Sequence, residues 1–154
     1  MPSPRSTPAA QTGMTLVELM IVMAILAALA AMAWPVFQEA VQRSRRADGM
    51  AALTEIMQSQ ERWRANNPQY QATLADLPGA RTVSHDNHYD LSLVAGSVTA
   101  TAYTARATVR SSSPQTSDSR CQVLQLVVNG GNITYSSLAS GNAANAAPDP
   151  CWAR

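Results

Sequence analysis

The feature that most constrains this chain is an apolar run from Leu19 to Phe37 that contains no charged residue and directly follows Glu18. At about 1.5 Å of rise per residue, a helix over this run matches the roughly 30 Å hydrocarbon core of a membrane. An ionisable group in such a segment costs about 2.5 to 3.5 kcal/mol on insertion scales. We therefore expect a membrane or assembly helix, and a cationic partner for the Glu18 carboxylate.

The rest of the chain has room for one small domain. Its 154 residues leave about 100 outside the apolar segment and its flanks, which excludes a large catalytic architecture. Eleven basic residues against ten acidic ones make the chain nearly neutral, so no strong general attraction to nucleic acid is expected. No grouping of Ser, His, Asp or Cys suggests a nucleophile. We expect no enzyme, no cofactor and no metal, and we interpret the ligand-type residues from His85 to Asp90 as a polar loop that enters a strand.

The N-terminal half of the chain is predicted to be a leader followed by one long helix. Residues 1–13 are Pro-rich and polar with Arg5 as their only charge, which is typical of a removable leader. Residues 14–37 would form the transmembrane or assembly helix, and residues 38–66 would continue it as an amphipathic helix. Pro35 removes one backbone donor and predicts a kink. The amphipathic half has a stripe of apolar residues at spacings of three and four: Met50, Leu53, Ile56, Met57 and Trp63.

Beyond Asn66-Asn67-Pro68, which should end the helix, the pattern predicts an antiparallel sheet. The segments 88–94, 97–110 and 121–129 are rich in Val, Thr, Tyr and Leu, and a short fourth strand is expected over 132–138. Ala95-Gly96 indicates a tight hairpin, and we expect Ser111 to Asp118 to be a solvated connector. The predicted fold is α+β: a globular domain over residues 38–154, with its long helix packed on a sheet of three to four strands within residues 88–138.

The two cysteines, Cys121 and Cys151, lie on the side of the apolar segment that would be exported, where a disulfide can form and persist. A metal site would require more ligands. A bridge would fasten the C-terminal tail, which has no strand pattern of its own, to the third predicted strand. Closing a loop of about 30 residues contributes up to roughly 3.6 kcal/mol to the free energy of unfolding in the chain-entropy model.

The N-terminal sequence resembles the prepilin signature of type IV pilins and type II secretion pseudopilins. The resemblance lies in Gly13, a hydrophobic Met14, and then Thr15-Leu16-Val17-Glu18-Leu19. Pro35 also stands where pilins commonly have a proline. Weaker similarity to the type IV minor pilins of Gram-negative bacteria continues through Arg43 to Asp48, Gln60 to Trp63 and Tyr70 to Leu77. The cysteine pair resembles the disulfide-bounded C-terminal region of type IV pilins, here residues 121–151.

This resemblance implies a structural subunit of a type IV pilus, which serves adhesion, twitching motility or DNA uptake. Prepilin peptidase would cleave after Gly13, and the new amine of Met14 would be methylated. Thr15, Glu18 and Pro35 would take part in assembly, with Glu18 paired to the Met14 amine of a neighbouring subunit as a check on register. The implied partners are other pilin subunits, prepilin peptidase and the inner-membrane assembly platform. The precursor would cross the inner membrane once with its domain in the periplasm, and would then enter the pilus at the cell surface.

Several alternatives remain open from the sequence. A pseudopilin of a type II secretion machine would use the same N-terminus. The apolar run could also be an ordinary secretory signal cleaved after Ala33, or a plain single-span anchor. As a binding module, the domain could contact DNA phosphates through Arg81, Arg106, Arg110 and Arg120. Two features depart from expectation: the leader is weakly basic, and Arg43, Arg45 and Arg46 follow the span against the positive-inside rule.

Overall fold

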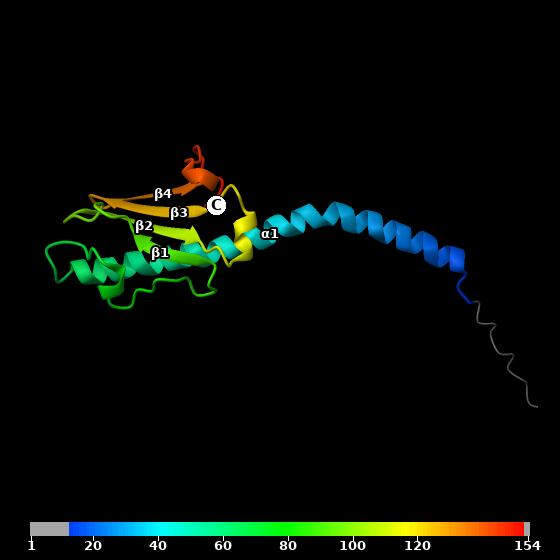
Figure 1. Ribbon diagram of the computed structural model, residues 1–154, viewed down its shortest axis with the longest axis horizontal. Coiled ribbons are helices and arrows are strands. Elements are labelled where there is room, and N and C mark those ends of the chain that lie inside the picture. Colours follow the sequence, from blue (N-terminus) through cyan, green and yellow to red (C-terminus); the bar gives the residue numbers. More distant parts are fainter. Residues whose placement is uncertain (1–12, 153–154) are drawn as a thin grey trace, which may run out of the picture. The chain divides into compact units, whose positions relative to one another are not determined.

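The computed structural model describes residues 13–152, so the predicted leader lies outside the described residues except for Gly13. Within these residues, one α-helix, α1 (Leu16–Arg64), is followed by four strands: β1 (Tyr89–Leu93), β2 (Ala102–Val109), β3 (Val123–Asn129) and β4 (Asn132–Leu138) (Figure 1). Short 3₁₀ turns η1 (Leu74–Asp76), η2 (Pro114–Ser117) and η3 (Ser140–Asn142) lie in the connections. The chain divides into two compact units, one ending at Gln38 and one beginning at Glu39.

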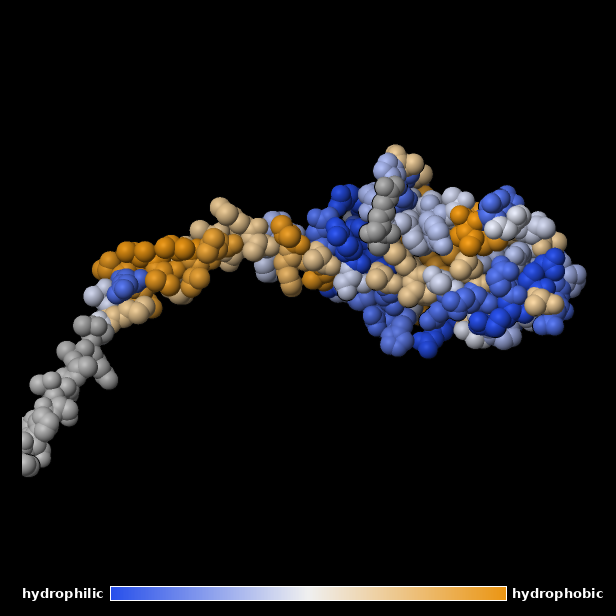
Figure 2. Space-filling view, turned by 180° about the vertical axis from the view of Figure 1, so that it is seen from behind, coloured by the Kyte–Doolittle hydropathy of each residue, from blue (hydrophilic) through white to orange (hydrophobic). Residues whose placement is uncertain are grey.

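The first unit is the apolar half of α1. It is long and apolar enough to cross a membrane, and none of the residues in its most apolar stretch is buried within the chain. Figure 2 shows this surface as an almost uninterrupted apolar band. Large side chains such as Leu16 (76% exposed) and Met32 (76% exposed) have no intramolecular cover. A helix that is apolar all round requires lipid or another protein around it.

The second unit contains the sheet, whose strands are antiparallel in the order β1-β2-β3-β4. Leu91 lies opposite Ala107, Ala105 opposite Leu126, and Leu126 opposite Tyr135, which places these side chains on the face of the sheet toward α1. Gly130 and Gly131 join β3 to β4 with positive φ at both positions, as a two-residue hairpin turn of type I′ requires. The α+β prediction is confirmed.

The core lies between the second half of α1 and the inner faces of β1, β2 and β3. Leu53 and Ile56 of α1 are fully buried, and Met50, Met57 and Trp63 pack around them half-buried. Gly49 marks the closest approach of helix and sheet, because a Cβ there would lie 3.0 Å from the Tyr89 ring and 3.1 Å from Leu124. All of these core residues belong to the second unit, so this unit has a hydrophobic core of its own.

The second strand is shorter than predicted. It begins at Ala102 and not at Ser97, although the turn at Ala95-Gly96 is present, with Ser97 N donating to Val94 O (3.1 Å). The Ser97 hydroxyl accepts from Thr104 N (3.0 Å), and the Thr99 hydroxyl accepts from Ala102 N (2.9 Å). These side chains take the place of strand partners for the backbone, which is how Ser and Thr favour turns over extended ladders.

The expectation of a solvated connector from Ser111 to Asp118 is wrong for part of that segment. Gln115 is fully buried and Asp118 is 2% exposed. The Ser113 hydroxyl caps η2 by accepting from Gln115 N (3.1 Å), and the Gln115 amide donates to Asp118 Oδ2 (2.9 Å). Short polar side chains here form a folded turn that packs on α1, because their hydrogen bonds are made within the protein and not with water.

Candidate functional site

The described chain begins at the predicted processing site. Gly13 and Met14 precede α1 in non-helical conformation, and both are exposed. Thr15 caps the helix, since its hydroxyl accepts from Glu18 N (3.2 Å). The T-x-x-E spacing is that of a capping box, and a carboxylate in the first turn is favoured by the helix dipole. Thr15 therefore defines the first turn that positions Glu18.

Pro35 lies inside the continuous helix, so the proline does not end α1. The kink that we expect there remains a prediction. Trp34 and Phe37 flank Pro35, and each is 63% exposed. Aromatic residues at the end of an apolar span are typical of a membrane interface.

The arginines that follow the span are engaged by the domain. Arg46 Nε donates to Asp118 Oδ2 (2.7 Å) in a buried ion pair, while Arg43 lies 3.6 Å from Glu39 on the surface of α1. These groups belong to a folded domain and not to a short loop, and only short loops follow the positive-inside rule closely.

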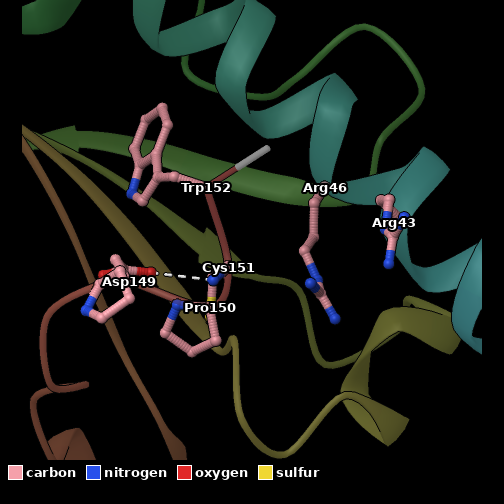
Figure 3. Close-up of a pocket in the computed structure, with 7 residues that line it drawn as sticks. Arg43, Arg46, Asp149, Pro150, Cys151 and Trp152 are labelled. Carbon is pink, nitrogen blue, oxygen red and sulfur yellow. Dashed lines mark hydrogen bonds between the residues drawn. The ribbon is translucent and has the colours of Figure 1, made fainter. Parts of the chain in front are cut away.

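A hollow of about 470 Å³ lies between α1 and the C-terminal tail, lined by Arg43, Arg46 and residues 148–152. Figure 3 shows the two arginines extending from α1 on one side, with Asp149, Pro150 and Cys151 opposite them. The charges here are nearly balanced, because Glu39 lies near both Arg43 and Arg120 (3.9 Å) and Asp118 neutralises Arg46. With Asp149 in the lining, the three arginines and three carboxylates described around the hollow balance, so these residues give it no net positive charge to attract an anion.

The tail is held by a disulfide and by side-chain hydrogen bonds. The structure joins Cys121 to Cys151, both almost fully buried. Asp149 accepts from the Ser137 hydroxyl (2.7 Å) and from Cys151 N (2.9 Å), the second of which is drawn in Figure 3. Asn145 donates to Arg120 O (2.8 Å). These contacts fasten the tail to the start of β3 and the end of β4.

Two of the four arginines considered for DNA binding, Arg106 and Arg110, lie on the outer face of the sheet, and a third, Arg81, lies beside β1. Arg106 is on the outer face of β2, the face away from α1, because the inner residues Ala105 and Ala107 alternate with it. Arg110 follows β2 with the same alternation and pairs with Asp90 on β1 (3.1 Å). Arg81 is exposed beside β1, where the next residue, Thr82, accepts from Leu91 N (2.8 Å).

Arg81 and Arg106 are the two of these groups that have no carboxylate partner among the described residues. The side-chain amide of Gln125 is best satisfied with its oxygen turned toward β2. In that orientation the oxygen accepts from the guanidinium of Arg106. Within residues 13–152, no carboxylate forms a salt bridge with Arg106. Arg120, by contrast, lies with Glu39 beside the tail. The four arginines are therefore not one cluster: Arg106 and Arg110 share the outer face of the sheet, Arg81 lies beside β1, and Arg120 lies apart from them near Glu39.

The segment from His85 to Asp90 forms a polar loop that enters β1. His85 Nδ1 lies 2.9 Å from Asp86 Oδ1, and Asp48 of α1 accepts from the Ser84 hydroxyl (2.6 Å). Among the residues that the structure describes, no group of three His, Cys, Asp or Glu side chains is placed to hold a metal ion.

Two family models match the chain. The family described as "Type IV minor pilin ComP, DNA uptake sequence receptor" matches residues 35–125, which is more than half of the chain. The prokaryotic N-terminal methylation motif matches residues 8–34. No curated protein matches the chain. Neither family match supports the pseudopilin alternative, and the domains of this family are structural and not enzymatic. The chain therefore belongs to the ComP family of type IV minor pilins, and is a pilus subunit with an N-methylation motif at the start of its apolar helix.

Proposed function

We propose that this minor pilin binds double-stranded DNA and holds it for uptake. Two observations support the proposal. The family that matches residues 35–125 is described as a DNA uptake sequence receptor, and Arg81, Arg106 and Arg110 lie within that match. The observation that carries it structurally is the placement of Arg106 and Arg110 on the outer face of the sheet, with Arg81 exposed beside β1. Neither Arg81 nor Arg106 forms a salt bridge among the described residues.

The spacing of these arginines suits the backbone of a duplex. Arg106 and Arg110 are four residues apart, about 13 Å at the rise of a strand. Duplex DNA presents one negative charge per about 1.7 Å of axis, so each guanidinium can reach a phosphate without any rearrangement of the sheet. The net charge of only +1 favours a local contact over general adhesion to nucleic acid.

Phosphate contacts position a duplex but do not read its sequence. Amide side chains that can read base edges lie next to the arginines: Asn87 accepts from Arg110 Nη1 (3.3 Å), and Gln125 lies opposite Arg106. Asn and Gln pair with adenine through both ends of their amides. We infer that these two residues contribute whatever sequence preference this surface has.

Binding is tested with the globular domain, residues 38–154, and a short fluorescein-labelled duplex in anisotropy titrations at several salt concentrations. The double variant Arg81→Ala/Arg106→Ala should bind about tenfold more weakly and reduce the salt slope by about 2, one for each phosphate that the variant no longer neutralises. Arg43→Ala is the matched control, because this exposed arginine is paired with Glu39 away from the proposed surface. If both variants bind like the wild type, or if Arg43→Ala is equally weakened, the surface is assigned wrongly.

The route into the pilus is a second part of the proposal. We infer that the inner-membrane precursor spans the membrane through residues 14–37, with residues 38–154 in the periplasm. Prepilin peptidase then cleaves between Gly13 and Met14, the Met14 amine is methylated, and the assembly platform adds the subunit to other pilins. The exposure of Gly13 and Met14 before the cap at Thr15 supports access by the peptidase.

Glu18 has a specific role in this route. It is the only acidic residue in the exposed apolar half of α1, and a charge buried in a filament core without a partner costs about 3 to 5 kcal/mol. The methylated amine of Met14 on a neighbouring subunit is the cation that the motif supplies. Pairing the two therefore selects one stagger between helices whose remaining contacts are non-directional.

A further inference from the structure

The two edges of the sheet are protected to different degrees. The edge of β1 is covered by the preceding segment, since Leu91 N donates to Thr82 O (2.8 Å) and Ser84 N donates to Tyr89 O (2.9 Å). The edge of β4 is covered only at its end, where Asn145 N donates to Ser137 O (3.0 Å) and Ala139 N donates to Ala143 O (2.8 Å). Residues 132–136 of β4 have no such backbone cover among the residues described. Trp152 Nε1 donates to Ser136 O (2.8 Å), but Ser136 is paired with Gln125, so its carbonyl faces β3 and not the open edge.

The hairpin turn determines which backbone groups face this open edge. In a two-residue turn, Asn129 and Asn132 form the first hydrogen-bonded pair, so alternate residues of β4 point their N–H and C=O away from β3. Ile133 and Tyr135 are the outward residues in the uncovered stretch. Within residues 13–152, nothing binds the backbone N–H or C=O of either residue. The edge thus presents two open donors and two open acceptors.

The side chains of this stretch do not discourage pairing. Natural edges are usually blunted by charge, proline or a bulge, and Asn132-Ile133-Thr134-Tyr135-Ser136 contains no charge and no proline. Ile133 and Tyr135 are 45% and 46% exposed although they lie on the inner face of the sheet. Tyr135 contacts Trp152, with ring centroids 4.6 Å apart. Ile133 borders a groove of about 500 Å³ in which Met57 and Val128 lie beside the polar side chains of Gln58, Glu61 and Arg62.

We propose that β4 pairs with β4 of a second copy of this chain, antiparallel about a two-fold axis at Thr134. The segment is self-complementary in this register. Ile133 lies opposite Tyr135 of the second copy, which is a favourable pairing of β-branched and aromatic side chains, and Asn132 lies opposite Ser136 of the second copy. The two Ile133–Tyr135 pairs form four backbone hydrogen bonds, which occupy every open group on both edges.

The length of the open edge agrees with this register. The glycine turn of the second copy comes opposite Ser137, the residue whose carbonyl is already bonded by Asn145. The pairing therefore ends where the tail begins. It buries the exposed inner strip of each copy against the other, and continues the two sheets into one.

Such a contact links subunits that belong to different filaments. A two-fold interface uses the same patch on both copies and closes on itself, whereas the subunits of one helical filament meet head to tail through unlike surfaces. The β4 edge is then a lateral contact between pili, independent of DNA binding on the outer face of the sheet.

Cysteine cross-linking tests the register directly. In this arrangement Thr134 faces Thr134 of the second copy as a non-hydrogen-bonded pair with Cα atoms about 4.5 Å apart, within the range for a disulfide. Thr134→Cys in the domain 38–154 should give a covalent dimer on mild oxidation. Thr108→Cys is the matched control, because Thr108 is an exposed threonine on the same outer face but on β2. It should cross-link at the background rate.

Sedimentation velocity over a concentration series gives an independent readout. The wild-type domain should show a monomer–dimer equilibrium, and Thr134→Lys should weaken it about tenfold, because two like charges then face each other at the axis. Thr108→Lys should leave it unchanged. A domain that stays monomeric, a dimer insensitive to Thr134→Lys, or equal cross-linking at positions 108 and 134 would each overturn the proposal.

Discussion

Arg46 on α1 and Asp118 after η2 form a buried ion pair, with Arg46 Nε 2.7 Å from Asp118 Oδ2 and side chains 5% and 2% exposed. Gln115 donates to the same carboxylate oxygen, and Gln42 of α1 donates to the Ser117 hydroxyl (3.4 Å). The segment that precedes Cys121 is thereby fastened to the helix by polar contacts. The ion pair links the start of the disulfide-bounded region to α1.

Breaking this pair should destabilise the domain strongly. Asp118→Ala leaves the Arg46 charge buried without a partner, at a cost of about 3 to 5 kcal/mol in the free energy of unfolding. Urea unfolding of the domain 38–154 measures the change. The double variant Arg46→Met/Asp118→Leu should recover most of it, since no buried charge remains. Arg43→Ala, which breaks only an exposed pair, should cost at most about 1 kcal/mol, and a similar loss in all three variants would contradict this explanation.

Gly49 should tolerate no side chain. The Cβ of alanine would lie 3.0 Å from the Tyr89 ring and 3.1 Å from Leu124, and both of these fully buried side chains would have to shift to admit it. Gly49→Val should lower the free energy of unfolding by about 1 to 3 kcal/mol through overpacking. Ala51→Val, at an exposed position of the same helix, should change it little. Equal effects of the two substitutions would mean that β-branching in the helix, and not contact with the sheet, is responsible.

The sequence was sufficient to predict the elements of this fold but not its polar interior. The amphipathic helix and the strands could be predicted because their buried side chains are apolar. Apolar residues recur every three or four positions from Met50 to Trp63, and at every second position in the strands. The buried face of α1 also includes Arg46, Gly49 and Gln60, and these have no apolar signal. Their burial depends on distant partners: Gln60 is fully buried because its amide binds both N and O of Gln71 (2.9 and 2.8 Å).

The candidate surfaces were predictable to a similar extent. The N-terminal signature and the cysteine pair are local features of the sequence. The division of the arginines was not predictable, because Arg110 and Arg120 flank the same segment, yet one pairs with Asp90 across the sheet and the other lies near Glu39 of α1. The open edge of β4 also depends on tertiary structure, since only the position of the tail distinguishes it from the covered edge of β1.

Stability should decline at alkaline pH. Burial raises the pKa of Tyr103 above its usual value, with a further contribution from the nearby Glu61 carboxylate, and burial likewise raises the pKa of Tyr89. Because these tyrosines ionise more readily when unfolded, their contribution to the free energy of unfolding should be constant below about pH 10 and fall above it, by about 1.4 kcal/mol per pH unit for each. Tyr103→Phe should remove the contribution of one tyrosine, about 1.4 kcal/mol per pH unit, from that slope. An unchanged slope in this variant would contradict the assignment.

Glu18 should govern assembly and not folding. In Glu18→Ala the Met14 amine loses its partner, so incorporation into filaments should fall while the amount in the membrane stays normal. The comparison is between sheared filaments and membrane fractions, by immunoblot. Among the described residues, none of the hydrophobic core precedes Met50, so the domain should unfold at the same temperature in variant and wild type. Equal incorporation of the two proteins would show that Glu18 is not the register contact.

The most direct test of the pilin assignment is the N-terminus of the protein recovered from sheared pili, determined by mass spectrometry. We predict a chain that begins at Met14 with one methyl group on its amine, and that retains Glu18 and the whole of α1. A chain recovered with its leader intact, or one that begins after Ala33, would contradict the assignment, because the apolar helix would then not be the mature assembly element of a pilin.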